Sequence, residues 1–199
     1  MGRPRLHDET TREALLAAAE HLIEAGGPTA LTVRAVADEA GTTTQAVYTL
    51  FGSKDRLLDD LAQRSFELLR DAIAARPATD DPAADLVQAG LEVFRPMAVE
   101  HPSMFRVAFL RAAPQLELSE DTWSAASQGF ALLCERCQRI ADANLLGGRD
   151  PAVAATQFNA LCEGLATDEL RNPNYIGPDP KLAWRNALTT LTNGFRIPP

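Results

Sequence analysis

Apolar side chains recur at helical spacing along most of the chain. Over residues 10–25 they form the single stripe of an amphipathic helix, at Leu15, Ala18, Ala19, Leu22 and Ile23. Thr10 followed by Glu13 fits a capping box, and the glycine pair at 26–27 ends the stripe. We therefore predict that the first helix begins at Thr10.

Two short helices and a long one follow this first helix. The pattern predicts the short helices over residues 32–40 and 43–51, separated by Gly41. The long helix is predicted over residues 54–76, with Ser53 as its N-cap.

The remainder of the chain continues the helical pattern. Pro96 is expected to bend the first helix of this part, because proline lacks an N–H and its ring clashes with the preceding turn. Asp-Pro pairs at 150–151 and 179–180 are typical helix starts. The predicted helices cover residues 83–99, 103–112, 122–146, 151–171 and 180–195. With no predicted strand, the fold class is all-α with nine helices.

Composition narrows the class of protein. The chain has 199 residues, of which 46% are hydrophobic and 23% charged, as in a globular protein with one sizeable core. It shows neither a secretory signal nor an apolar run long enough to span a membrane, so we expect a cytoplasmic protein with no membrane partner. The net charge of −8 means that any contact with DNA must depend on the local placement of cations.

The two short helices carry the most informative pattern. Gly41 permits a tight turn between them, and Ala37 and Val47 supply a small core where they cross. This arrangement indicates a helix-turn-helix, whose second helix enters the major groove of DNA. That helix carries polar side chains suited to base edges and phosphates, namely Thr42, Thr43, Thr44, Gln45, Tyr48 and Thr49.

Cations lie close to this motif. Lys54 stands at the start of the next helix, where its charge adds to the positive end of the helix dipole. Arg3 and Arg5 precede the first helix and are expected to reach a phosphate or the minor groove as a flexible arm.

The run from Leu31 to Leu58 closely resembles the N-terminal domain of the tetracycline-repressor (TetR) family. The marks that carry the resemblance are Ala37, Gly41, Val47, Tyr48, Phe51, Ser53, Lys54, Leu57 and Leu58. The resemblance implies a homodimeric transcriptional regulator, usually a repressor, with a palindromic double-stranded DNA operator and a small-molecule effector but no cofactor. Residues 1–52 are then the DNA-binding domain, and residues 53–199 bind the ligand and form the dimer.

The same resemblance assigns roles around the second short helix. Thr32, Thr43, Tyr48 and Lys54 are expected to hold phosphates, while Thr44, Gln45 and Thr49 face bases. The sequence departs from the commoner family pattern at Thr44, Gln45 and Ala46, where a lysine or proline, a glycine and a threonine often stand. Because these positions lie in the part of the helix that faces bases, the departure bears on which residues contact the bases.

In this family the last two helices commonly form the dimer interface. The apolar positions of these two helices predict that interface at Phe158, Leu161, Leu165, Trp184, Leu188, Leu191 and Phe195. The alternative is that these stripes cover the core of their own subunit.

A large and mainly apolar ligand pocket is a further expectation. Its predicted lining is Phe94, Met97, His101, Met104, Phe105, Phe109, Trp123, Phe130 and Glu163. Aromatic and methionine side chains at helical spacing also suit a plain core, and Glu163 also suits a paired structural acid.

Other chemistry finds little support. Cys134 and Cys137 share one face of a predicted helix with Phe130, which favours burial over redox chemistry. No cluster completes a metal site, and no nucleophile–base pair suggests an enzyme. The acidic charge balance keeps one alternative function open, a helical small-molecule-binding protein with a degenerate helix-turn-helix.

Overall fold

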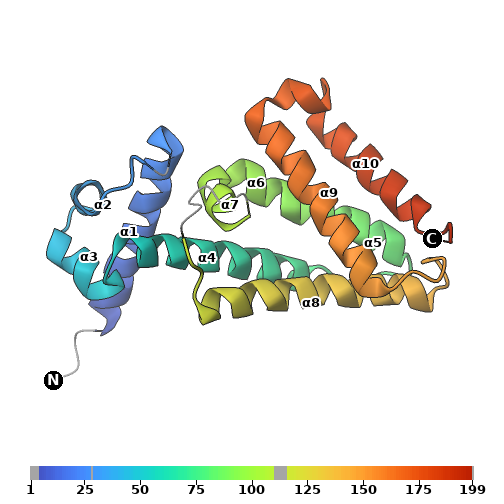
Figure 1. Ribbon diagram of the computed structural model, residues 1–199, viewed down its shortest axis with the longest axis horizontal. Helices are drawn as coiled ribbons and strands as arrows, with labels where there is room; N and C mark the ends of the chain where they lie inside the picture. Colours follow the sequence, from blue (N-terminus) through green and yellow to red (C-terminus); the bar gives the residue numbers. More distant parts are fainter. Residues whose placement is uncertain (1–4, 28, 110–115, 199) are drawn as a thin grey trace. The chain divides into compact units, whose positions relative to one another are not determined.

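The computed structural model describes residues 5–27, 29–109 and 116–198, and within them every regular element is a helix (Figure 1). The all-α prediction is confirmed, and nine helices are present in this described part when α5, η1 and α6 are taken as one continuous helix and the short 3-10 helix η2 is not counted. The elements are α1 (Arg5–Gly26), α2 (Val33–Glu39), α3 (Thr44–Phe51), α4 (Lys54–Ala75), α5 (Pro82–Ala89), η1 (Gly90–Phe94), α6 (Arg95–Glu100), α7 (Pro102–Ala108), α8 (Glu120–Asp142), α9 (Pro151–Arg171), η2 (Pro173–Ile176) and α10 (Pro180–Gly194).

The chain divides into two compact units. The first contains residues 1–65 and 102–122, and therefore includes α1 to α3, the first part of α4, and α7. The second contains residues 66–101 and 123–199. The predicted boundary after Gly52 separates two functions, DNA binding and ligand binding, whereas the two compact units are separated by their contacts. The functional boundary therefore stays a prediction.

The core of the first unit comes from one face of each of its first four helices and from the loop before α2. Its largest contributors include Leu15, Ile23, Leu31, Val36, Val47, Leu57 and Leu61, all of them buried. Gly41 has a φ of +64°, and the N–H of Thr42 bonds the carbonyl of Ala37 at 2.9 Å, so α2 ends in the glycine turn that the sequence predicts. Ala37 and Val47 are buried as expected.

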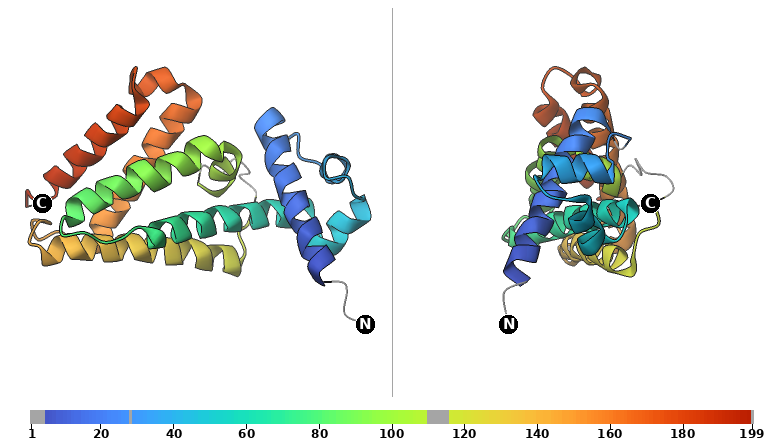
Figure 2. Two further views of the ribbon diagram at one scale, coloured as in Figure 1. Left: turned by 180° about the vertical axis from the view of Figure 1, so that it is seen from behind. Right: turned by 90° about the vertical axis from the view of Figure 1, so that its left-hand side faces the viewer.

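In the second unit, α4 and α8 lie side by side and run in the same direction (Figures 1 and 2). Arg70 donates to Gln128 at 3.0 Å across this contact. Helices α9 and α10 lie side by side in opposite directions (Figures 1 and 2). The ring of Phe94 meets the edge of Phe158 at a centroid distance of 5.7 Å, which joins α9 to η1.

Three predicted helix boundaries are wrong. Helix α7 ends at Ala108, four residues before the predicted end. Helix α1 begins at Arg5, so Thr10 lies inside the helix and cannot cap its start. Helix α8 ends at Asp142, four residues before the predicted end, because Asn144 adopts a φ of 58°. Asparagine tolerates this left-handed conformation, and the bond from Leu145 N–H to the carbonyl of Ile140 (3.0 Å) completes the turn.

The helix around Pro96 accommodates the missing N–H of the proline through a wide turn, and not through the bend that the sequence predicts. The turn Gly90–Phe94 is a π-helix, in which the N–H of Arg95 bonds the carbonyl of Gly90, five residues back. A wider turn of this kind contains one extra residue and accommodates a position without an N–H.

Candidate nucleic-acid interface

Helix α3 has one buried face and one exposed face. Val47 and Phe51 are buried against the first unit. The polar side chains predicted to meet DNA are exposed, namely Thr43, Thr44, Gln45, Tyr48 and Thr49. Tyr48 keeps 52% of its surface accessible although it is a large aromatic side chain. The face is therefore free to meet a partner.

Two of the predicted phosphate contacts also cap helices. The hydroxyl oxygen of Thr32 accepts a hydrogen bond from Ala35 N–H (3.1 Å), and that of Thr43 accepts one from Ala46 N–H (3.2 Å). Each hydroxyl uses an oxygen lone pair in its cap and keeps its own proton. Both threonines can therefore cap a helix and donate to a phosphate oxygen at the same time.

Gln45 and Thr49 are coupled on the exposed face. The hydroxyl of Thr49 donates to the carbonyl of Gln45 at 2.8 Å, and the Gln45 side-chain amide donates to Thr49 Oγ1 at 3.4 Å. The single proton of Thr49 is thus committed within the helix. Gln45 retains the carbonyl oxygen and a second N–H of its amide, which makes it the better base reader of the pair.

Lys54 is the first residue of α4, and its side chain is half-exposed. The hydroxyl of Ser53 caps this helix by accepting from Arg56 N–H at 3.1 Å, as the sequence predicts. Arg3 lies outside the described residues. Arg5 begins α1, but its side chain is likewise outside what the structure describes.

Sequence reasoning missed two cations near these positions. The side chain of Arg34 in α2 is 87% exposed, and its contact with Asp38 is long, at 3.7 Å. Arg56 is exposed in the first turn of α4 and donates to the buried carboxylate of Asp59 at 3.2 Å. Their closeness to the caps Thr32 and Ser53 was a signal already present in the sequence.

The structure distributes the predicted pocket residues unevenly. Phe94, Met97, Met104 and Phe105 are buried, whereas Trp123 and Phe130 on α8 are exposed. Met104, Phe105 and Phe109 belong to the first unit, and the other six predicted residues, His101 and Glu163 among them, belong to the second. Glu163 accepts from Asn159 at 2.6 Å, and burial raises its pKa despite this hydrogen bond.

The structure corrects the predicted dimer contacts. Four of these side chains are buried within their own chain and cannot meet a partner in this structure: Phe158, Trp184, Leu188 and Phe195. Trp184 donates to Glu169 at 2.8 Å, and Arg149 lies over the ring of Phe195. The stripe on the last two helices thus serves the subunit's own core. The other three, Leu161, Leu165 and Leu191, are half-exposed.

The cysteines are poorly suited to redox chemistry. Burial raises the pKa of the Cys134 thiol, and raises that of Cys137 to about 12. Because the thiolate is the reactive species, these thiols are weak nucleophiles at neutral pH. The described residues contain no cluster of three or more metal-ligating side chains, and none of their helices is both long and apolar enough to cross a bilayer.

Comparisons with known proteins agree with this geometry. Residues 15–61 match the family model described as bacterial regulatory proteins, tetR family. No curated protein matches the chain.

Solved structures match over almost the whole chain. NalD, the secondary repressor of the MexAB-OprM multidrug efflux pump in Pseudomonas aeruginosa, is 27% identical with a TM-score of 0.66, over 94% of this chain and 96% of that one. The TetR family regulator PfmR from Thermus thermophilus is 20% identical with a TM-score of 0.71, over 89% and 96%. A Rhodococcus protein of unknown function is 24% identical with a TM-score of 0.78, over 92% and 94%.

Proposed function

We propose that the chain represses transcription as a homodimer until a small molecule releases it from DNA, on the premise that residues 15–61 match the tetR family of bacterial regulatory proteins. This match supports a DNA-binding regulator and not an enzyme, as the sequence predicts. Repression, the effector, the palindromic operator and action in the cytoplasm are parts of the proposal. The similarity to NalD, which is a repressor, supports the first of these.

The exposed face of α3 carries the proposal. Gln45 and Tyr48 are exposed on one face of α3, and Val47 is buried on the opposite face. A monomer reads a single half-site, whereas two copies read successive major grooves one helical turn apart. A palindromic operator therefore follows from the proposed dimer.

The proposed dimer uses the outward faces of α9 and α10. Val153 on α9 and Leu182 on α10 keep about half of their surface exposed, at 49% and 50%. These two helices lie side by side, so their free faces from two copies can build a four-helix interface (Figure 2). This assignment replaces the four core residues that the sequence pattern suggested.

Selection of bound DNA from a random pool, followed by fluorescence anisotropy, tests the function. Gln45→Ala is expected to lose about 1–3 kcal/mol at one base pair of the selected site and to relax the preference there. Gln138→Ala is the matched control, because Gln138 is exposed on α8 and bonds only Asp142 among the described residues. Failure of the pool to yield a preferred site would favour the alternative, an acidic small-molecule-binding protein with a degenerate motif.

A further inference from the structure

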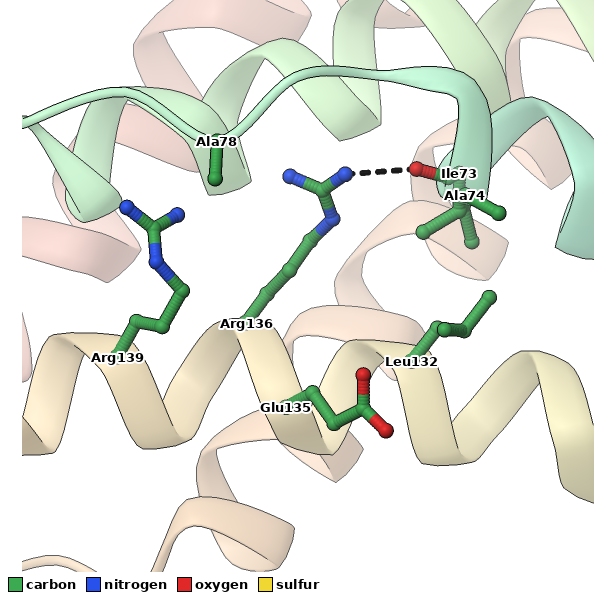
Figure 3. A pocket seen from close by; sticks show the side chains of 7 residues that line it. All are labelled: Ile73, Ala74, Ala78, Leu132, Glu135, Arg136 and Arg139. Atoms are coloured by element: carbon green, nitrogen blue, oxygen red, sulfur yellow. Dashed lines mark hydrogen bonds between the residues drawn. The ribbon is translucent and has the colours of Figure 1, made fainter.

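A groove of about 180 Å³ lies at the end of α4, within the second unit (Figure 3). Its walls come from the last turn of α4, the segment after it, and the middle of α8. Four lining residues are apolar and three are charged: Ile73, Ala74, Ala78, Leu132, Glu135, Arg136 and Arg139. This mixture suits a ligand with an apolar body and a charged head.

The guanidinium of Arg136, on α8, bonds backbone carbonyls at the end of α4. Its Nη2 donates to the carbonyls of Ile73 (2.6 Å) and Arg76 (3.0 Å) at the end of the helix, and the first of these also accepts from Arg76 N–H at 3.3 Å. A guanidinium has five N–H donors, so those on Nη1 and Nε remain for another acceptor within the described part of the chain. In Figure 3 the second terminal nitrogen of Arg136 is turned toward the side where Arg139 lies.

Positive charge exceeds negative charge around this guanidinium. Arg139 donates to Asp85 at 2.7 Å and also to the carbonyl of Thr79. The groups that act on Arg136 are Asp85, Arg139 and Arg76, and Glu135 stands on the groove wall. Three cations against two carboxylates leave one positive charge in excess. Burial is the largest cause of the lowered pKa of Arg136; Asp85 raises this pKa, and Arg139 and Arg76 lower it. A bound anion would act in the same direction as Asp85 and favour the charged guanidinium.

We propose that this groove binds a small organic monoanion, whose carboxylate meets Arg136 and whose apolar body lies along Ala74 and Leu132. The size supports a ligand with a single ring, since an apolar cavity of about 150 Å³ holds benzene. The inference rests on the proposed effector and gives its chemical class. It also places the ligand on the residue that caps α4, the helix that begins with Lys54.

Isothermal titration with benzoate tests the site directly, with benzamide as the neutral probe of similar shape. Benzoate is expected to bind saturably at one site per chain, and benzamide at least about tenfold more weakly, because hydrogen bonds to charged groups are the stronger ones. Ala78→Leu fills part of the groove while leaving both arginines in the sequence, and it should weaken benzoate binding at least about tenfold. Arg136→Gln should do the same. Arg70→Gln should not, because Arg70 bonds Gln128 across the α4–α8 contact and does not line the groove.

The outcomes separate cleanly. The absence of saturable benzoate binding, equal binding of benzamide, or wild-type affinity in Ala78→Leu would overturn the site. Ala78 is exposed, so its substitution keeps the test valid even if Arg136→Gln fails to fold. DNA binding is measured separately in the anisotropy assay. Benzoate binding without DNA binding would remove the proposed function and leave the site, and the reverse result would remove the site alone.

Discussion

Trp184 donates a hydrogen bond from its indole N–H to Glu169 at 2.8 Å, and Arg95 donates to the same carboxylate from Nε (3.2 Å) and Nη2 (2.7 Å). The three side chains come from α10, α9 and α6. Glu169 is almost fully buried, and its charge is matched by a bidentate arginine. The cluster therefore joins three helices of the second unit at one point.

We expect Glu169→Gln to lower the free energy of unfolding by roughly 3 kcal/mol, because it leaves the charge of Arg95 without its partner. The loss stays at the lower end of the usual range, since Arg95 keeps 22% of its side chain in water. Urea unfolding measures it. Glu92→Gln, which breaks the exposed pair with Lys181, is the control and should change stability by less than about 1 kcal/mol. Equal losses in the two variants would contradict the cluster's role.

Lysine occurs only at positions 54 and 181, which provides a matched pair for the DNA interface. Lys54→Ala should weaken binding to all DNA sequences alike and reduce the slope of log affinity against log salt by about 1. Lys181→Ala, on α10, should leave both quantities unchanged. A loss confined to one base pair, or an unchanged salt slope in Lys54→Ala, would show that Lys54 does not meet a phosphate.

Gly41 occupies a backbone conformation that costs other residues energy. A Cβ added there meets no atom within 4 Å, so the whole penalty of Gly41→Ala comes from its φ of +64°. We expect Gly41→Ala to lose about 1–2 kcal/mol in thermal or urea unfolding. Gly41→Asn should lose less, because asparagine adopts this conformation more readily. An alanine variant as stable as the asparagine variant would rule out this explanation.

Acid should weaken the contact around Asp85. Burial by itself raises the pKa of this carboxyl, but hydrogen bonds from Thr79 and Arg139 outweigh burial and hold the pKa below 3.8. A carboxyl with a lowered native pKa adds stability above its unfolded pKa, and that stability is lost as the pH falls through the native value. The free energy of unfolding of the wild type should thus fall more steeply below about pH 4 than that of Asp85→Asn. Parallel curves for the two proteins would contradict this assignment.

The revised dimer interface makes its own prediction. Leu182→Glu and Val153→Glu should shift the protein from dimer to monomer at micromolar concentration, because each places a carboxylate in an apolar interface. Analytical ultracentrifugation measures the mass. Val99→Glu is the control, since Val99 is also exposed but lies on α6. A wild type that is itself monomeric, or two variants that remain dimers, would exclude this interface.

Local features of the sequence predict most of the candidate site. Thr43 and Ser53 cap their helices, and Gly41 adopts the left-handed turn, because each depends on the few residues around it. The exposed face of α3 follows from the same short-range pattern. The residues that we propose to meet DNA are thus largely those whose geometry neighbouring residues determine.

The long-range contacts could not be predicted in this way. Trp184 and Leu188 fall on an apolar stripe. The periodicity of apolar residues identifies which face of the helix is buried, but it does not identify the element that packs against that face. The cover here includes Gly90, where an added Cβ would lie 2.4 Å from a methyl group of Leu188. The partners Arg95 and Glu169 are 74 positions apart, so no local pattern connects them.

The π-helical turn Gly90–Phe94 has a consequence for changes in chain length. Because the turn contains one residue more than an α-helical turn, loss of a single residue there would restore regular winding and preserve the orientation of both flanks. The same loss inside α8 would rotate every later side chain by about 100° about the axis. Regular winding would, however, bring Pro96 against the carbonyl four positions earlier. The extra residue and Pro96 are therefore expected to be gained or lost together among homologues.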